Sequence, residues 1–151
     1  MGERGFKGKM KSTRRYTHLN KMGEKGVQRV IEHFTVQGYK CKDEQKNRKA
    51  KGYDILLRRG NKKLKIEVKT TQKEEGIPDC YVSEFDKNNK FISNFLCIVR
   101  LDKKFKLKKI ELLNSTEVNK YPHTRIERVR ISSTLKTDLK NGRIGKVIYR
   151  S

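Results

Sequence analysis

Three residues of one short segment have the types and the spacing of a metal site. In the run Gly-Tyr-Asp-Ile-Leu-Leu-Arg-Arg-Gly-Asn-Lys-Lys-Leu-Lys-Ile-Glu-Val-Lys, residues 52–69, a Gly-Asn pair separates two stretches of alternating apolar and polar residues. A two-residue loop of this kind joins antiparallel strands through a tight primed turn. Counting outward from that turn places Asp54 opposite Glu67, with Lys69 two residues further along the same face.

Two opposed carboxylates bring like charges together. Their Cβ atoms would lie ~5 Å apart, which destabilises the pair unless a positive charge lies between them. Such oxygen ligands suit a hard cation such as Mg²⁺, which binds one or two carboxylates and otherwise keeps waters or phosphate oxygens. The Lys69 ammonium would then hold an attacking water or a phosphate oxygen. One alternative is a solvent-exposed ladder of strand charges, and a register slip of one residue would also separate Asp54 from Glu67.

The elements around this segment must position it. One face of the predicted hairpin is apolar and should face the core; it carries Tyr53, Ile55, Leu57, Leu64, Ile66 and Val68. Apolar residues at helical spacing predict an amphipathic helix over residues 23–37, ended by Gly38; they are Val27, Val30, Ile31 and Phe34. Glu24 is on this stripe, so we expect its carboxylate to point toward the sheet. The alternative is a first-turn Glu that complements the helix dipole.

The rest of the chain predicts a mixed α/β fold. We expect strands over residues 39–42, 94–101, 105–113, 126–131 and 145–149, charged or polar loops over 43–51 and 70–79, and a short helix over 83–91. In the second loop, Gln72 is a candidate for binding a metal-bound water or phosphate, with an ordinary solvated glutamine as the alternative. The basic segment 114–151 would extend the domain and either bind substrate or form a dimer.

The order of these residues resembles a nuclease signature. Asp54 followed thirteen residues later by Glu67-Val68-Lys69 is similar to the motif of the PD-(D/E)XK superfamily, in which a hairpin carries an acidic residue and then a carboxylate-x-Lys. Within it, the chain most resembles the archaeal Holliday junction resolvases in its length, in the early Glu24 and in the run Ile-Glu-Val-Lys-Thr-Thr. The resemblance covers roughly residues 22–113.

The chain also departs from that pattern. Tyr53 stands where the family has proline, and the literal Pro78-Asp79 follows the lysine in the wrong order. The pieces Gly-Tyr-Asp-Ile and Glu-Val-Lys-Thr-Thr also resemble restriction-associated domains of the same fold. The resemblance therefore leaves open which nuclease branch applies.

The resemblance implies a restriction endonuclease-like fold, an α/β arrangement with a mixed β-sheet flanked by helices and the active site on a central β-hairpin. It implies that Asp54, Glu67 and the main-chain carbonyl of Val68 bind Mg²⁺ or Mn²⁺, that Lys69 orients the attacking water, and that Glu24 completes the catalytic site. The reaction would be metal-assisted in-line hydrolysis of a DNA phosphodiester. Symmetric cutting of a four-way junction needs two sites, so the resolvase reading predicts a homodimer.

Composition favours a nucleic-acid partner. The chain has 39 Lys and Arg against 17 Asp and Glu, a formal net charge of +22 that exceeds what solubility requires. Aromatic residues make up 8% and Trp is absent, which disfavours base stacking on single strands and favours duplex or branched DNA held by phosphate contacts. A ribosomal or membrane-surface protein is the alternative. The expected DNA-binding residues are Arg14, Arg15, Lys46, Arg48, Lys49 and Lys51.

At 151 residues, the chain fits one domain. Residues 1–22 hold seven Lys or Arg and one Glu, which predicts a flexible basic arm that follows DNA or only aids solubility, before a nuclease-like domain over 23–151. No apolar run is long enough for a membrane span or a signal peptide, so we expect no membrane partner and an intracellular, cytoplasmic protein.

Cysteine and histidine indicate no second chemistry. The three cysteines are odd in number and widely spaced, so they form no disulfide framework, and we expect Cys97 in the core. The histidines give no zinc-ligand spacing. The sequence thus predicts a Mg²⁺-dependent endonuclease, with junction resolution as the leading activity. The alternatives are a restriction- or repair-type endonuclease and a non-catalytic nucleic-acid-binding protein that retains the fold.

Overall fold

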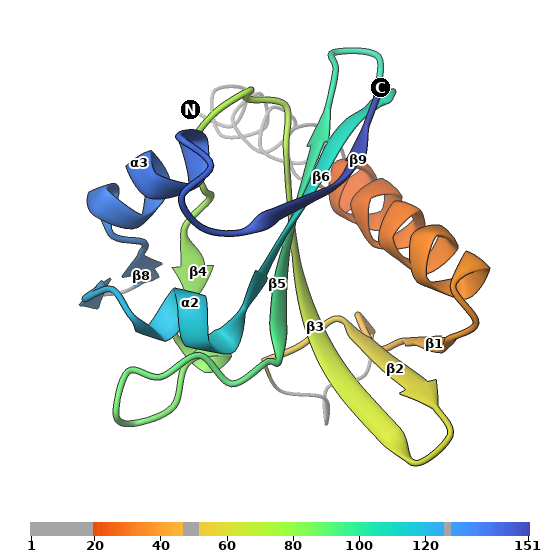
Figure 1. Ribbon diagram of the computed structural model, residues 1–151, viewed down its shortest axis with the longest axis horizontal. Coiled ribbons are helices and arrows are strands. Elements are labelled where there is room, and N and C mark those ends of the chain that lie inside the picture. Colours follow the sequence, from red (N-terminus) through yellow and green to blue (C-terminus); the bar gives the residue numbers. More distant parts are fainter. Residues whose placement is uncertain (1–19, 47–51, 126–127) are drawn as a thin grey trace, which may run out of the picture.

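Six strands form the central sheet of the computed structural model, which describes residues 20–46, 52–125 and 128–151. The strand order is β1-β2-β3-β5-β6-β9. The β3 and β5 strands are parallel, and all other neighbours in this sheet are antiparallel. Helices cover both faces (Figure 1), so the protein is a mixed α/β fold. The strands are β1 Lys40–Asp43, β2 Ile55–Arg59, β3 Lys62–Thr71, β5 Phe95–Leu101, β6 Leu107–Asn114 and β9 Lys146–Arg150.

The β2–β3 hairpin has the predicted register. Gly60 has φ +59°, the conformation that the first central position of a type II′ turn requires. Strand β3 runs on beyond the hairpin to pair with β5, so Thr70 and Thr71, which we expected in a loop, belong to the strand. The confirmed pairs are Ile55 with Ile66, Leu57 with Leu64 and Arg59 with Lys62.

The N-terminal helix covers one face of this sheet. Its described part spans residues 20–36, so residues 20–22, which we assigned to the basic arm, are helical; residues 1–19 lie outside the described part. Gly38, with φ +91°, follows the helix end as predicted. The buried side of the helix joins one apolar cluster with both hairpin strands; it includes Val27, Val30, Phe34, Ile55, Leu57, Ile66 and Val68.

Helix and sheet approach closely at Gly26. A Cβ atom added there would lie 1.8 Å from Thr70 Oγ1 and 2.9 Å from Thr70 Cβ, whereas one added at Gly23 would meet nothing within 4 Å. Gly26→Ala should therefore destabilise the protein by ~1–3 kcal/mol through overpacking. Gly23→Ala should stabilise it by roughly 0.5–1 kcal/mol through helix propensity. Urea unfolding of the two variants measures both changes in the free energy of unfolding. Changes of the same sign in the two variants would contradict the close approach at Gly26.

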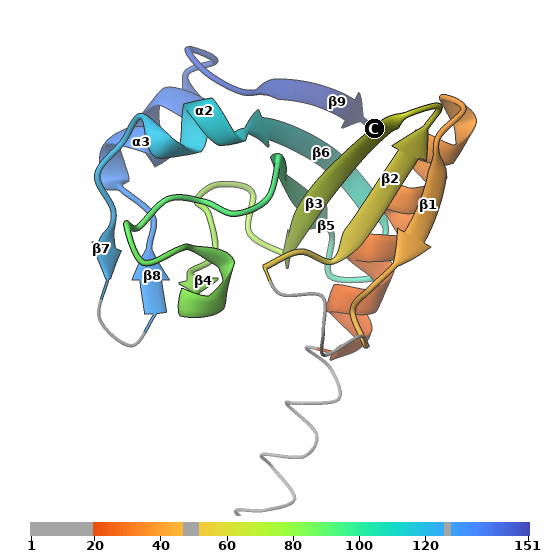
Figure 2. The same ribbon diagram turned by 90° about the horizontal axis from the view of Figure 1, so that it is seen from below.

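The second face of the sheet is covered by two segments of the chain, one that precedes β5 in the sequence and one that follows β6 (Figure 2). A small sheet of order β4-β8-β7 lies there with two short helices. Their apolar residues form a second core with Leu96, Ile98 and Leu113 of the central sheet. These elements are β4 Cys80–Tyr81, the 3₁₀ helix η1 Val82–Glu84, α2 Ser115–Asn119, β7 Thr124–Arg125, β8 Arg128–Arg130 and α3 Ser133–Lys140.

The helix predicted over residues 83–91 is wrong. Only η1 is helical, and Phe85 and Phe91 instead face each other in an antiparallel bridge with ring centroids 5.4 Å apart. The Asp86 carboxylate accepts hydrogen bonds from the main-chain N–H groups of Asn88 and Lys90. An Asp side chain that satisfies the local backbone in this way favours a turn over a helix.

The C-terminal segment is part of the fold. Strand β9 pairs with β6 as the edge of the central sheet, close to the predicted strand 145–149, and β8 lies within the predicted strand 126–131. Helices α2 and α3 were not predicted. Cys97 is fully buried as expected, and all three cysteines are free. Within the described ranges, no helix is both long enough and apolar enough to cross a membrane.

Candidate metal centre

Glu67 and Lys69 are buried on the face of β3 opposite the N-terminal helix. The parallel register places them beside Leu96 and Ile98, which belong to the second core. Only 5% of Glu67 and 8% of Lys69 is exposed. This burial excludes the solvent-exposed ladder of strand charges, because charged groups withdrawn from water need specific partners.

Asp54 lies immediately before β2, where the chain enters the hairpin. Its N–H donates to the Ile66 carbonyl at 2.8 Å, and its own carbonyl accepts from the Glu44 N–H at 2.8 Å. Its carboxylate oxygen Oδ2 accepts from the Val68 N–H at 2.9 Å. The Asp54 side chain is thus held against β3 next to Glu67, as the sequence predicted.

The carbonyl of Val68 belongs to the same corner. In a strand, the N–H and C=O of one residue point to the same side. Since the Val68 N–H points to Asp54, the Val68 carbonyl oxygen points to that side as well, where β2 has not yet begun. This carbonyl is therefore placed to act with the two carboxylates as an oxygen ligand.

Glu84 is the third carboxylate of the centre, and it is not among the residues predicted from the sequence. Lys69 Nζ lies 2.6 Å from Glu84 Oε1 and 3.4 Å from Glu67 Oε1. It also lies 4.9 Å from the centroid of the Tyr81 ring. Glu84 lies between Ser83 and Phe85 in a stretch of mixed polar and apolar residues, so the sequence pattern gave no indication that it is buried.

Negative charge exceeds positive charge in this centre, which comprises Asp54, Glu67, Glu84 and Lys69. Burial raises the pKa of Glu67 well above its usual value, and the nearby charges of Asp54 and Glu84 raise it further. Burial likewise raises the pKa of Asp54, against the opposing effects of the Val68 hydrogen bond and the Lys69 ammonium. Burial disfavours the Lys69 ammonium, but Glu67 and Glu84 outweigh it and raise the pKa of Lys69. Without metal, the two neighbouring carboxylates therefore favour the ammonium form of Lys69.

This donor set fits a hard divalent cation. Glu84 Oε2 is buried with no hydrogen-bond partner, so the centre has one oxygen atom that no protein group contacts by a hydrogen bond. Within the described ranges, no group of three or more His, Cys, Asp or Glu side chains has the geometry to hold a metal. Mg²⁺ does not require one, because it commonly binds one or two carboxylates and completes its shell with carbonyl, water or phosphate oxygens. Asp54, Glu67 and the Val68 carbonyl would hold it.

Glu24 is not on the buried stripe, so that expectation is wrong. Its side chain is exposed, and no hydrogen bond or ion pair joins it to another residue in the described part of the chain. At ~100° per residue, Glu24 is turned roughly 85° from the centre of the stripe formed by Val27, Val30 and Phe34. Whether it completes the catalytic site stays a prediction.

The other candidate residues lie away from the centre or outside the described part. Gln72 Nε2 donates to the Asp102 carbonyl at 3.2 Å, and Gln72 lines a different pocket, near the ends of β3 and β5. Lys46 is exposed after β1. The remaining predicted DNA-binding residues lie outside the described ranges; they are Arg14, Arg15, Arg48, Lys49 and Lys51.

Without metal, the protein should lose stability as the pH rises. The folded-state pKa of Glu67 is above its usual value, so folded protein binds this proton more tightly than unfolded protein. The contribution of this proton to the free energy of unfolding is complete below the unfolded-state pKa of ~4.3 and is lost as the pH rises through the folded-state pKa. Its size is about 1.4 kcal/mol for each pH unit by which the two pKa values differ. Urea unfolding in chelator should give a smaller free energy at about pH 8 than at about pH 5.

Two further measurements isolate the cause of that pH dependence. Glu67→Gln should reduce the pH dependence, because the amide does not titrate. Mg²⁺ should stabilise the wild-type protein more at the higher pH, because metal binding requires deprotonated carboxylates. Equal stabilisation by Mg²⁺ at both pH values would contradict the assignment of Glu67 as a ligand.

The comparisons with known proteins identify one family. The family described as Protein NO VEIN, C-terminal, matches residues 22–111, more than half of the chain. The matched segment runs from the N-terminal helix into β6 and includes Asp54, Glu67, Lys69 and Glu84. No curated protein and no solved structure matches the chain. This protein belongs to the Protein NO VEIN, C-terminal, family.

Proposed function

We propose that this protein is a metal-dependent endonuclease that hydrolyses DNA phosphodiester bonds, with four-way junctions as the leading substrate. The observation that carries the proposal is the buried centre in which Asp54 and Glu67 face one corner of β3 beside the Lys69 ammonium. Membership of a nuclease-like family supports the same chemical class. The net charge of +22 supports a polyphosphate substrate.

The sheet supports a restriction endonuclease-like fold. The site lies on the strand that is shared by an antiparallel hairpin and a parallel pair, β3 with β5. The N-terminal helix packs against the apolar face of this strand, and the acidic residues lie on its other face. This arrangement agrees with the PD-(D/E)XK resemblance, which rests on Asp54 and on the run Glu67-Val68-Lys69.

The residues of the centre have separable roles. A bound Mg²⁺ or Mn²⁺ would polarise the phosphate and make hydroxide available near neutral pH. Asp54 and Glu67 would hold the ion, and the Val68 N–H fixes the orientation of the Asp54 carboxylate. Lys69 donates hydrogen bonds from its ammonium group, so it orients the attacking water and stabilises charge on the phosphate. Glu84 fixes the position of that ammonium through the 2.6 Å ion pair.

The decisive assay is cleavage of a labelled four-way junction at low salt, with linear duplex and single strand alongside. Mg²⁺ or Mn²⁺ should give paired nicks confined to the junction, and chelator should abolish them. Cleavage of plain duplex would instead identify a restriction- or repair-type enzyme. DNA binding without any cleavage would overturn the proposal in favour of a non-catalytic protein. Symmetric nicks also require two sites, so the active species should be a homodimer in light-scattering measurements.

A further inference from the structure

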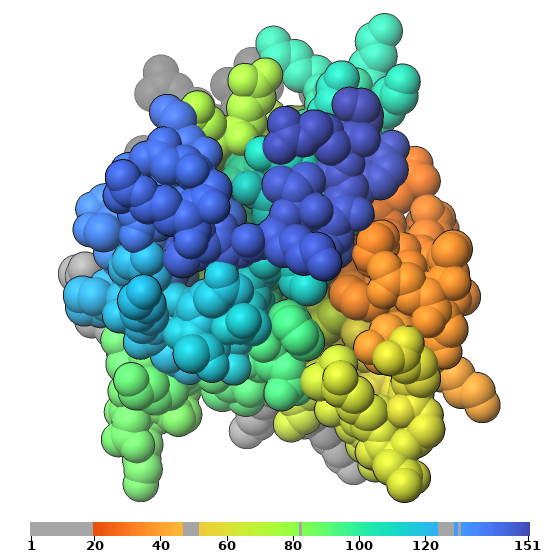
Figure 3. Space-filling model, viewed as in Figure 1, coloured from red at the N-terminus to blue at the C-terminus, as the bar shows by residue number. Residues whose placement is uncertain are grey.

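A large pocket lies away from the metal centre. It has a volume of about 790 Å³ and lies where β3 and β5 end, between α3 and the β5–β6 turn, with β9 beside it. In Figure 3 it opens between the blue surfaces of α3 and β9. A pocket of this size is large enough for part of a polymer or for a small molecule.

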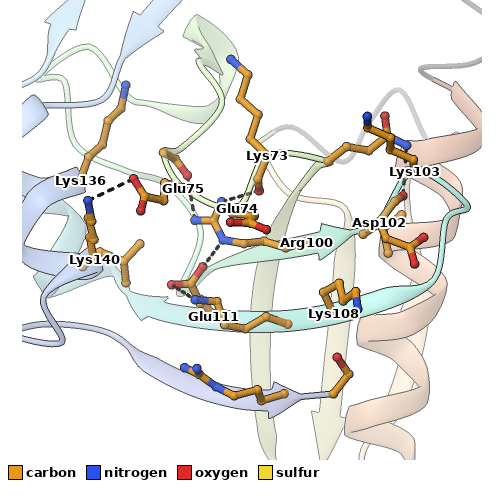
Figure 4. A pocket seen from close by; sticks show the side chains of 17 residues that line it. Lys73, Glu74, Glu75, Arg100, Asp102, Lys103, Lys108, Glu111, Lys136 and Lys140 are labelled. Atoms are coloured by element: carbon orange, nitrogen blue, oxygen red, sulfur yellow. Dashed lines mark hydrogen bonds and ion pairs between the residues drawn. The ribbon is translucent and has the colours of Figure 1, made fainter.

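Arg100 forms the buried floor of this pocket. Its Nε donates to Glu111 Oε1 at 2.5 Å, and its terminal nitrogens donate to the carbonyls of Lys73 at 3.1 Å and Gly76 at 2.8 Å. Figure 4 shows Arg100 between Lys136 and Lys140 on one side and Asp102 and Lys103 on the other. The charges of Arg100 and Glu111 neutralise each other. The bonds from Arg100 to the Lys73 and Gly76 carbonyls hold the segment after β3 in place.

The charge around this floor is strongly positive. The lining includes eight basic residues and only four acidic ones. Glu111 forms ion pairs with Arg100 and Lys109, and Glu75 forms an ion pair with Lys140. In the part of the chain that the structure describes, five lining cations make no ion pair; they are Lys73, Lys103, Lys108, Lys136 and Arg150.

This pocket lies on the same face of the sheet as the metal centre. Lys69 pairs with Ile98 and Thr71 with Arg100, so the pocket floor is two residues beyond Lys69 along β3. That is ~7 Å at ~3.3 Å per residue, a distance of about two nucleotides at ~3.4 Å per step of one strand. One nucleic-acid strand can therefore contact both places.

We propose that this pocket binds the phosphodiester backbone of the nucleic-acid strand beside the bond being cut, an inference that rests on the proposed function. Its cations are mainly lysines, which act as flexible point charges and suit phosphate contacts that do not depend on sequence. No aromatic side chain lines it, so it lacks a platform for base stacking. The metal centre performs the hydrolysis, and the pocket binds the strand and sets how it lies relative to the metal centre.

The test reverses charge on two opposite walls and leaves the buried floor intact. Lys103 is exposed and Lys136 half-buried, so the Lys103→Glu/Lys136→Glu variant should fold. The control is Lys62→Glu/Lys87→Glu, which makes the same change of net charge at two exposed positions outside the pocket. Binding of a short labelled duplex is followed by fluorescence anisotropy in chelator, over a series of salt concentrations. Urea unfolding checks that both variants are folded.

The pocket variant should bind at least about tenfold more weakly at low salt. Its slope of log affinity against log salt should fall by ~1.8, since each lost phosphate contact removes ~0.9. The control should change much less. Equal losses in the two variants would overturn the pocket assignment and leave the proposed function standing.

Other outcomes separate this inference from the proposed nuclease activity. Loss of binding in the pocket variant, with no cleavage by the wild-type protein, would support the pocket and overturn the nuclease. Failure of the wild-type protein to bind either the duplex or the four-way junction would overturn both. Polyglutamate that competes with DNA as strongly as unlabelled duplex would assign the pocket to an acidic protein partner and overturn the nucleic-acid assignment.

Discussion

Asp54→Asn and Glu67→Gln should each reduce metal-dependent cleavage by more than about a hundredfold. Loss of even an outer partner of a metal ligand typically costs roughly 10–100-fold, and these substitutions remove the ligand charge itself. DNA binding in chelator should be unchanged or stronger, because each variant removes a carboxylate that repels phosphate. Single-turnover cleavage of the four-way junction and anisotropy in chelator measure the two effects separately.

A matched control is available in the literal Pro-Asp pair. Asp79 is exposed in the loop before β4, so Asp79→Asn makes the same chemical change outside the centre and should retain wild-type cleavage. Cleavage that survives in both Asp54→Asn and Glu67→Gln would show that the metal centre is assigned to the wrong residues.

Lys69→Met should suppress turnover by ~10²–10³-fold, the usual effect of removing a group that stabilises transition-state charge. It should also destabilise the protein by roughly 3–5 kcal/mol at about pH 8, because it leaves buried carboxylates without their cation. The stability loss should shrink at about pH 5, where more of the carboxyl groups are protonated, since burial already raises the pKa of Glu67 and Asp54. Cleavage rates and urea unfolding at both pH values test this.

A double-mutant cycle shows whether the ion pair is the cause. Adding Glu84→Gln to Lys69→Met removes one of the uncompensated charges, so the double variant should be more stable than Lys69→Met alone. Lys63→Met is the matched control, because Lys63 lies on the same strand but is exposed. Additive stability losses for the two substitutions would contradict the 2.6 Å pair.

The hairpin and the position of its acidic residues were determined by local sequence. Gly60-Asn61 selects a turn, the turn sets the register, and a period of two then places Asp54 beside Glu67 and Lys69. The N-terminal helix and strands β5 and β6 were also predictable, because each is a long segment with clear hydrophobic periodicity. Short elements with weaker periodicity, such as α2 and α3, were not.

Tertiary structure decided what the sequence left open at the centre. The sequence could not distinguish a buried metal centre from an exposed charge ladder, because alternation of residues along β3 is the same in both. Burial by the second core excludes the ladder, and it also brings Glu84 to Lys69 from a segment that we had predicted to be helical. The same packing places the exposed Glu24 outside the buried stripe.

The basic pocket also depends on tertiary structure. Its cations come from the end of β3, the β5–β6 turn, β6, α3 and β9, which are far apart in the chain. Composition alone determined that the protein is strongly cationic and suited to polyphosphate. Only the fold decides which of those charges are neutralised, as Arg100 is by Glu111, and which converge unpaired on one face, because sequence spacing carries no information about contacts between distant segments.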